Sequence, residues 1–407
     1  MVTVTPSTGF SVFAFFTITH TNSSSILPYS ALLEKQMMAY INSVLIVIII
    51  AQQETKTIPK MTVHRKTKFF CLNQWHSASE LIDLEGIPLW ISDVQKVVRF
   101  CLYNEKHFAF STSGSTGKSK VLEHSRSTLF ASAQATIDYF DLKPGNTALL
   151  CLPAKFTGGA MMIIRACLGG IQLVLEEPNL APSGLNHIDF LPLTPAQYIT
   201  SIEKGTLEGF KGVVLLGGSP ISAVYDVPTE QEVFIGYGMT ETASHVAVRR
   251  LGDKVYESVG ETSFRITDQG CLAISAPHLS ITDLETNDIV QLMGPRSFQF
   301  IGRADFVINS GGIKIHPEEW ERILSEHGIE ALISSNADPK FGEQTVLVLT
   351  STDQVTPTQE ALSFLPKIVR PKKAVILDNL PLNFAGKPDR IGIKEFILSH
   401  QDLLFQL

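Results

Sequence analysis

Short apolar runs alternate with amphipathic stretches in the first two thirds of the chain. Four runs are continuously apolar: 147–152, 171–175, 213–216 and 233–236. They predict strands that are buried on both faces. Residues 125–140 and 159–168 predict helices, the first of them beginning at Ser125. Strands that alternate with helices predict an α/β fold with a mainly parallel sheet and flanking helices.

The pattern changes after Arg303. Four further elements are expected there: a helix at 317–327, a helix near 358–365, and strands at 345–350 and 374–377. Pro317 suits the first turn of its helix, because a proline there costs no hydrogen bond. We therefore predict a large domain at 61–303 and a separate small α+β domain at 304–407.

The first 60 residues differ from the rest, since only five of them are charged. Their apolar block at 44–51 is much shorter than the roughly 20 residues of a membrane-spanning helix. Two interpretations stay open: a membrane-associating extension, or an upstream translation artefact with the true start at Met61. We favour the second, because the motifs begin after Met61. Residues 1–60 are thus interpreted as a disordered extension or a mis-assigned start, with no firm membrane association.

Composition narrows the class of protein. The chain has 407 residues, of which 44% are hydrophobic and 18% charged, so it can bury a sizeable core. A net charge of −7 disfavours nucleic acid as a partner. The cysteines form no C-x-x-C pair, and Cys101, Cys151 and Cys167 lie in apolar runs. We expect reduced core thiols in a cytoplasmic protein.

A loop rich in small polar residues follows the apolar segment 107–110. It reads Ser-Thr-Ser-Gly-Ser-Thr-Gly-Lys-Ser-Lys at 111–120. Its glycines let backbone N–H groups approach an anion, while its hydroxyls and lysines add donors and charge. A Walker P-loop would need glycine where Thr112 stands, so a P-loop kinase or ATPase is disfavoured. An ordinary surface loop remains the alternative. The expected phosphate ligands are Thr112, Ser113, Gly114, Ser115, Thr116, Gly117, Lys118 and Lys120.

A second motif, Gly-Tyr-Gly-Met-Thr-Glu-Thr, occupies positions 236–242 after an expected strand. An aromatic ring beside glycine at a strand end can stack on a base. Thr240 and Glu241 can hold phosphate and Mg²⁺. By itself the motif fits an ordinary turn equally well.

These segments together resemble the acyl-adenylate-forming enzymes, the superfamily of acyl-CoA ligases, luciferases and peptide-synthetase adenylation domains. The family's phosphate loop reads approximately S/T-S-G-S/T-T-G-x-P-K, and this chain departs from it only in having Ser119 at the proline. The segment 237–241 matches the family's Y-G-x-T-E motif throughout. The resemblance spans roughly 108–390. It implies a large adenylating domain followed by a small mobile lid domain.

The resemblance assigns roles to the nucleotide-side residues. Tyr237 would stack on adenine, and Thr240 would contact phosphate. Glu241 would hold Mg²⁺ together with Thr116. Further contacts to the nucleotide would come from Gly217, Gly218, Ser219, Gly238 and Met239.

The resemblance also covers the later motifs. Asp288, in a polar turn, resembles the aspartate that binds the ribose hydroxyls. Arg303 would contact ribose or phosphate, and Asp305 would be the hinge between the domains. The glycine loop at 310–315 would enter the active site for the second half-reaction.

The last motif lies near the C-terminus, where 381–390 is similar to the family's P-x-T/N-x-x-G-K-x-x-R. Lys387 would be the mobile lysine that stabilises adenylate formation. Arg390 is expected to be a structural anchor.

The resemblance implies a ligase that uses ATP, Mg²⁺, a small carboxylic acid and coenzyme A. The short spacing before the phosphate loop, together with 152–162 and 239–249, resembles the o-succinylbenzoate–CoA ligases of menaquinone biosynthesis. Phe156 departs from the family, which often has histidine there in the acyl channel. Alternatives are a CoA ligase for another aryl or fatty acid, a non-catalytic nucleotide-binding relative, and a membrane-anchored interaction protein led by 1–60. The oligomeric state, including a homo-oligomer, is left open.

o-Succinylbenzoate has two carboxylates, and the one that is not activated needs a cationic or polar partner. Candidates are Lys155, Arg165 and His245. Arg165 is otherwise expected on the surface of a helix, and His245 in a helix where the backbone satisfies it.

Overall fold

The four apolar runs of the sequence form parallel strands of one large sheet. The computed structural model describes residues 63–103, 105–112, 120–219, 221, 231–367, 369–382 and 388–407. The parallel strands, in spatial order, are β1 (Lys68–Cys71), β6 (Gln172–Leu175), β5 (Thr147–Leu150), β7 (Phe190–Leu193), β8 (Val213–Leu216) and β9 (Glu232–Gly238). β2 (Gln74–His76) is antiparallel to β1 at the edge. The predicted strands at 147–152, 171–175, 213–216 and 233–236 are thus confirmed.

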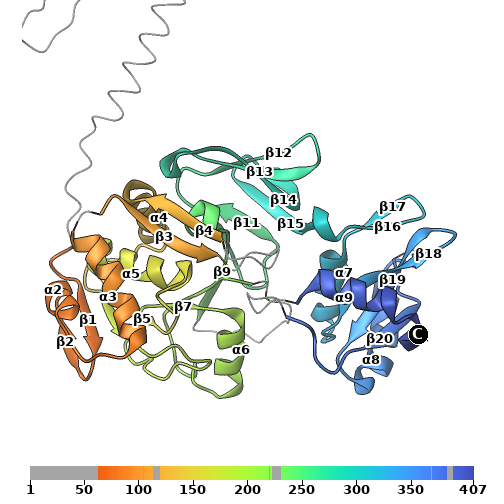
Figure 1. The fold of residues 1–407 in the computed structure, drawn as a ribbon, viewed down its shortest axis with the longest axis horizontal. Coiled ribbons are helices and arrows are strands. Elements are labelled where there is room, and N and C mark those ends of the chain that lie inside the picture. The colour runs from red at the N-terminus through yellow and green to blue at the C-terminus, as the bar shows by residue number, and fades with distance from the viewer. Residues whose placement is uncertain are drawn as a thin grey trace, which may run out of the picture. The chain divides into compact units, whose positions relative to one another are not determined.

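Helices flank these strands (Figure 1). They are α2 (Ala78–Ile82), α3 (Leu89–Leu102), α4 (Arg126–Tyr139), α5 (Thr157–Gly169) and α6 (Pro195–Glu203). The hydroxyl of Ser125 caps α4 by accepting from the Thr128 N–H, as the sequence predicted. α5 is buried around most of its circumference, which suits a helix that is apolar on all faces.

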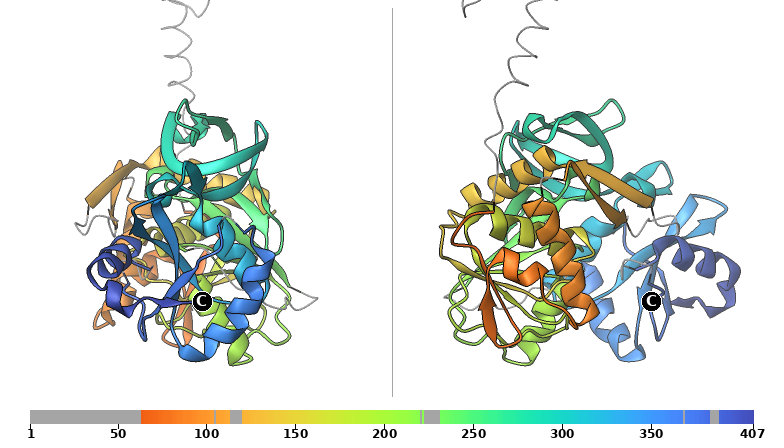
Figure 2. Two further views of the ribbon diagram at one scale, coloured as in Figure 1. Left: turned by 90° about the vertical axis from the view of Figure 1, so that its right-hand side faces the viewer. Right: turned by 60° about the vertical axis from the view of Figure 1, so that its left-hand side comes forward.

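The sheet continues beyond β9 as antiparallel strands that the sequence pattern did not predict. They are β10 (His245–Arg250), β11 (Val255–Ser258), β15 (Ser297–Arg303), β14 (Ile281–Gly294), β13 (Cys271–Ala276) and β12 (Ser263–Ile266), in that spatial order. These strands, green to cyan in Figures 1 and 2, bend along their length. These strands contribute most of an apolar cluster that includes Phe264 and Phe298.

A separate two-stranded hairpin frames the predicted phosphate loop. β3 (His107–Thr112) pairs with β4 (Lys120–Ser125), and Thr112 lies opposite Lys120 in the register. The loop at 113–119 lies outside the described residues.

The C-terminal part of the chain, blue in Figure 1, has its own sheet and its own apolar clusters. Its strands are β16 (Ile308–Ser310), β17 (Ile313–Ile315), β18 (Leu332–Asp338), β19 (Gly342–Leu349), β20 (Lys373–Ile376) and β21 (Phe405–Gln406). Its helices are α7 (Pro317–Glu326), α8 (Val355–Ala361) and α9 (Arg390–Ser399). The four elements expected after Arg303 are confirmed. Residues 62–407 form one unit by their contacts, so the domain boundary at 303 stays a prediction.

Short 3₁₀ segments connect several of these elements. They are Thr240–Thr242, Pro277–Leu279, Ala304–Phe306, Thr352–Gln354, Leu362–Phe364 and Gln401–Leu403.

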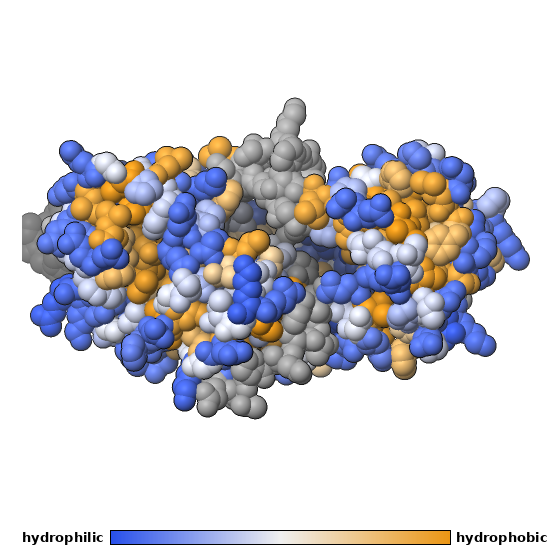
Figure 3. Space-filling model, turned by 90° about the horizontal axis from the view of Figure 1, so that it is seen from below, coloured by the Kyte–Doolittle hydropathy of each residue, from blue (hydrophilic) through white to orange (hydrophobic). Residues whose placement is uncertain are grey.

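The described surface is mixed in character. None of the described helices has the length and apolar character needed to cross a membrane. Apolar side chains reach the face seen in Figure 3 in patches among hydrophilic ones.

All five cysteines are buried free thiols, which confirms the expected core positions of Cys101, Cys151 and Cys167. The predictions for residues 1–60 concern positions outside the described residues.

Arg390 makes the contacts expected of an anchor. Its guanidinium forms a two-pronged ion pair with Glu321 on α7, one arm of which is 2.9 Å long. The side chains of Arg390 and Glu321 are only 18% and 11% exposed. Glu321 also accepts from the Ile333 N–H at 2.7 Å, and the guanidinium lies 5.3 Å from the centre of the Phe306 ring. The pair therefore ties α9, α7 and β18 together.

Replacing one member of this pair should destabilise the C-terminal part strongly. Arg390→Met leaves the Glu321 carboxylate largely buried without its cation, and Glu321→Gln leaves the Arg390 guanidinium without its carboxylate. Either change should lower the free energy of unfolding by about 3 kcal/mol. The double variant should lose less than the sum of the two single losses. Urea unfolding measures all three. The control is Arg250→Met, since Arg250 and Glu232 are 58% and 51% exposed and such a pair contributes about 1 kcal/mol or less. Strictly additive losses would contradict the coupling.

Candidate functional site

The predicted nucleotide residues gather at one edge of the sheet. β8 and β9 are parallel neighbours, so Gly217–Ser219 after β8 and Tyr237–Met239 at the end of β9 lie at their common carboxyl edge. Ligands of open α/β sheets bind at this edge. A Cβ added at Gly217 or Gly218 would meet no atom of the described residues within 4 Å, so these residues leave the space above this turn open.

The turn that carries Thr240 and Glu241 is held internally. The buried Thr242 hydroxyl lies 3.0 Å from both the N–H and the carbonyl of Met239 and 2.7 Å from the carbonyl of Ser244. Thr240 is partly buried and Glu241 is exposed. The Glu241 carboxylate is therefore accessible from outside the fold, and Thr240 is partly accessible.

Gly238 makes this turn possible. A side chain there would collide with the Ser244 carbonyl oxygen and would bring a Cβ to 2.6 Å from the Cα of His245. Both are backbone atoms where β10 begins, so neither can move aside cheaply. The glycines of the motif thus serve close packing of the backbone as well as access for a ligand.

Asp288 is a buried acceptor rather than a residue of a polar turn. It lies in β14, opposite Arg303 of β15, and is 5% exposed. The Tyr237 hydroxyl donates to one of its oxygens at 2.5 Å, and Arg303 donates to the other at 3.1 Å. Burial and the neighbouring Asp288 charge raise the pKa of Tyr237 far above its usual range. The expected polar turn at Asp288 was wrong, because this residue lies within β14 and pairs with Arg303 of β15.

The predicted hinge residue belongs to the same network. Asp305 accepts from Arg303 at 2.6 Å and from the side-chain amide of Asn287 at 3.0 Å. Asn287 was not singled out in the sequence. Its position beside Asp288 was the available signal.

The acyl-side candidates are placed differently from the sequence expectation. Arg165 is 2% exposed, so its expected position on a helix surface was wrong: α5 is an interior helix. His245 begins β10, so its expected place in a helix was wrong as well. Its Nε2 lies 3.2 Å from the Thr136 hydroxyl. Burial, and then the charge of Arg165, lower its pKa well below the usual range.

Arg165 has few partners for a buried cation. Its guanidinium donates to the Ser244 hydroxyl at 2.8 Å, while its Nε finds no hydrogen-bond partner within the described part of the chain. Burial lowers the pKa of Arg165 to about 9. Lys155, by contrast, is exposed, and its ammonium lies over the ring of Phe156 at 5.1 Å.

Several predicted site residues lie outside the described residues. They are Ser113, Gly114, Ser115, Thr116, Gly117, Lys118 and Lys387. The backbones of Thr112 and Lys120 flank the phosphate loop. Among the described residues, no three His, Cys, Asp or Glu side chains lie close enough to form a metal site. An exposed carboxylate such as Glu241 fits the way Mg²⁺ is usually held, by one or two carboxylates together with phosphates.

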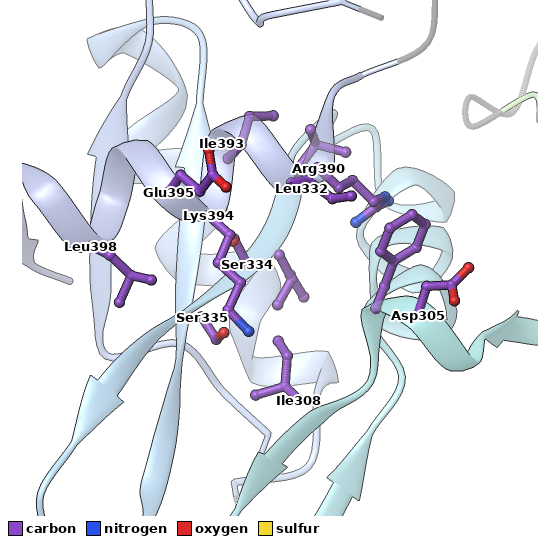
Figure 4. A pocket seen from close by; sticks show the side chains of 13 residues that line it. Asp305, Ile308, Leu332, Ser334, Ser335, Arg390, Ile393, Lys394, Glu395 and Leu398 are labelled. Atoms are coloured by element: carbon purple, nitrogen blue, oxygen red, sulfur yellow. The ribbon is translucent and has the colours of Figure 1, made fainter. Parts of the chain in front are cut away.

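A cavity of about 300 Å³ lies elsewhere, between α9, β18 and the segment after Asp305 (Figure 4). Its lining is largely apolar, and Lys394 extends along it toward Ser335. Lys394 is paired with Glu343 at 2.7 Å and Arg390 is paired with Glu321. Because these cations are already satisfied, the cavity does not call for the phosphates of a nucleotide.

Comparison with known proteins agrees with the motifs. The AMP-binding enzyme family matches residues 30–271, more than half of the chain. The chain belongs to the AMP-binding enzyme family. It is an acid–CoA ligase of the acyl-adenylate-forming kind, as its motifs predicted.

One relative found by sequence and two solved structures illustrate the similarity. A 2-succinylbenzoate–CoA ligase of Listeria monocytogenes is 27% identical over 322 residues, which are 70% of this chain and 68% of that one. The structure of an acyl-CoA synthetase (AMP-forming)/AMP-acid ligase II-like protein from Dyadobacter fermentans is 28% identical with a TM-score of 0.53, covering 79% of this chain and 99% of that one. The o-succinylbenzoate CoA synthetase MenE of Bacillus subtilis, solved with the acyl-adenylate OSB-AMP, shares the fold at 21% identity and a TM-score of 0.59, covering 70% of this chain and 68% of that one.

Gly238→Ala should damage this AMP-binding enzyme at its nucleotide edge. The new methyl group meets backbone, so the turn must shift, with a loss of about 1–3 kcal/mol in stability. Gly217→Ala is the control for stability, because its methyl group would meet no atom of the part of the chain that the structure describes. Thermal unfolding should show a lower Tm for Gly238→Ala only. Equal Tm values for the two variants would contradict the packing argument.

Tyr237→Phe distinguishes the role of the aromatic ring from that of the hydroxyl, because only the hydroxyl is removed. The ring can still stack, but Asp288 loses a donor, which typically costs about 1.5–3 kcal/mol for a charged acceptor. We expect about tenfold weaker ATP binding, measured by calorimetry. Tyr256→Phe is the matched control, since Tyr256 packs 5.8 Å from the same ring. An unchanged affinity in Tyr237→Phe would show that its hydroxyl does not prepare Asp288.

Proposed function

We propose that this enzyme activates o-succinylbenzoate with ATP and transfers the acyl group to coenzyme A, giving o-succinylbenzoyl-CoA for menaquinone biosynthesis. The observation that carries the proposal is the buried Arg165, whose charge meets a hydroxyl but no carboxylate among the described residues. The name of the Listeria monocytogenes relative points to the same acid.

A buried guanidinium without an acid is costly, because its charge has left water without a compensating partner. A substrate carboxylate can supply that partner, preferably through two parallel hydrogen bonds. Ser244, which already accepts from Arg165, is linked through its carbonyl to Thr242 in the turn that carries Glu241. Hydrogen bonds thus connect the Arg165 guanidinium, through Ser244, to the turn that would contact the nucleotide. A dicarboxylic acid would use one carboxylate at each end.

The remaining predicted site residues would each serve one part of the adenylation step. The activated carboxylate attacks the α-phosphate, and pyrophosphate leaves. Positive charge from Lys387 would offset the charge that develops there. Tyr237, Gly217, Gly218 and Ser219 would hold the adenine, and Asp288 and Arg303 the ribose and phosphate. Glu241 and Thr116 would hold Mg²⁺, which neutralises phosphate charge when bound.

The second step would follow a movement of the small domain. Rotation of 304–407 about Asp305 would withdraw Lys387 and bring the hairpin at 310–315 to the site. The CoA thiol then attacks the acyl-adenylate carbonyl, forming the thioester and releasing AMP. The hydrogen bonds of Asp305 to Arg303 and Asn287 are the contacts that such a rotation would have to exchange.

A second candidate is a CoA ligase for another aryl or fatty acid. Phe156 stands where the family often has histidine, and this side chain is exposed. The chain also spans nearly the whole length of the Dyadobacter fermentans protein, whose name specifies no acid, but only 68% of the Listeria monocytogenes ligase. A non-catalytic relative is disfavoured, because Glu241, Asp288, Arg303 and Lys387 are all retained.

The test is ATP- and CoA-dependent turnover of o-succinylbenzoate against a panel of benzoates and fatty acids. Arg165→Ala should raise the KM for o-succinylbenzoate about 30- to 100-fold through the lost charged hydrogen bonds. It should leave the residual turnover of monocarboxylic acids unchanged. Arg165→Lys keeps the charge and should retain part of the affinity.

Lys155→Ala examines the competing candidate and should have little effect. Turnover of monocarboxylic acids at the same efficiency as o-succinylbenzoate would refute the proposed substrate. An equal loss for all acids in Arg165→Ala would refute the role of Arg165.

A further inference from the structure

His124 joins two parts of the site that are far apart in sequence. It lies on β4, just beyond the phosphate loop, and its Nε2 is 2.6 Å from the carbonyl oxygen of Thr240. We infer that His124 is a positioning residue that holds the Thr240–Glu241 turn against the hairpin of the phosphate loop. The inference rests on the proposed function in so far as this turn serves Mg²⁺ and phosphate.

The His124 ring packs beside aromatic side chains of β3. Its centre lies 6.1 Å from that of Phe110, which is fully buried, and Phe110 in turn lies 5.2 Å from Phe108. Phe108 is also the residue opposite His124 in the register of β3 with β4. The imidazole therefore packs beside an aromatic side chain of β3 while its Nε2 reaches Thr240.

The bond has a defined direction. A carbonyl oxygen only accepts, so Nε2 must carry the hydrogen. The Thr240 oxygen already accepts from the Ala243 N–H at 3.0 Å within its own turn. His124 uses the remaining acceptor capacity of this oxygen, so the link adds a contact from outside to a turn that Thr242 braces from inside.

The consequence concerns relative placement. Thr112 and Lys120 end the two strands of the hairpin, and the predicted phosphate ligands lie between them. The predicted Mg²⁺ ligand Glu241 follows Thr240 directly. The His124 bond spans 116 positions of sequence and ties Thr240, and with it Glu241, to the strand that follows the phosphate loop. Misplacement of reacting groups by about 1 Å can cost on the order of 100-fold in rate.

A merely structural histidine would be replaced well by any ring of similar size. His124→Phe keeps the ring and removes the donor, whereas His124→Gln keeps an N–H donor and removes the ring. His107→Phe is the matched control, because His107 is an exposed residue at the other end of the same hairpin.

The experiment measures binding of ATP with Mg²⁺ by calorimetry and the exchange of pyrophosphate into ATP. For His124→Phe we expect about tenfold weaker ATP binding and a higher Mg²⁺ requirement, as for the loss of one hydrogen bond of about 1.4 kcal/mol. His124→Gln should recover most of the affinity, and His107→Phe should match the wild type. Thioester formation from added acyl-adenylate should change less than about twofold in all variants, because that step no longer needs the pyrophosphate side.

Wild-type affinity and Mg²⁺ requirement in His124→Phe would overturn the inference, and so would a His124→Gln variant as impaired as His124→Phe. If His124→Phe fails to fold, His124→Leu takes its place in the same comparison. A wild-type protein that binds ATP with Mg²⁺ but adenylates no acid of the panel would refute the proposed function alone, since the calorimetric comparison needs no acid.

Discussion

The carboxylate of Asp288 links β14 to β9, two strands that are not neighbours in the large sheet. It accepts from Tyr237 on β9 and from Arg303 on β15, so its burial is matched by two donors. In a flat sheet, β9 and β14 would be separated by four steps of about 4.8 Å. The antiparallel strands must therefore bend back for the hydroxyl to reach the carboxylate. The stacked rings of Tyr256 and Phe298 lie with their centres 5.3 Å apart in the apolar cluster of these strands.

Two largely buried arginines differ in how their charges are matched. Arg390 meets both oxygens of Glu321 and is satisfied within the fold, as a structural cation should be. Arg165 is more deeply buried and has only the Ser244 hydroxyl as its hydrogen-bond partner in the described part of the chain. Since burial penalises an unpaired charge, a side chain of the second kind marks a place where a ligand can contribute the missing partner.

Prediction from the sequence succeeded where local patterns decide the structure. The strand at 213–216 and the helix beginning after Ser125 were found because continuous apolar runs and a capping serine are local signals. The strands between 245 and 303 were missed. β14 alternates exposed and covered positions, carries several acidic residues, and shifts register against both of its neighbours. Local periodicity does not reveal such a strand, because its neighbours stabilise it.

The sequence by itself determined the family motifs, their order, and the parallel strands that bring the Gly217 and Tyr237 segments to one edge. Only the tertiary structure decided which side chains meet. Arg165 and Ser244 lie 79 positions apart in sequence, and Tyr237 and Asp288 lie 51 apart. His124, which no motif singled out, reaches Thr240 across 116 positions. Such contacts depend on the order and curvature of the strands, and these arise from packing across the whole sheet rather than from the periodicity of any one segment.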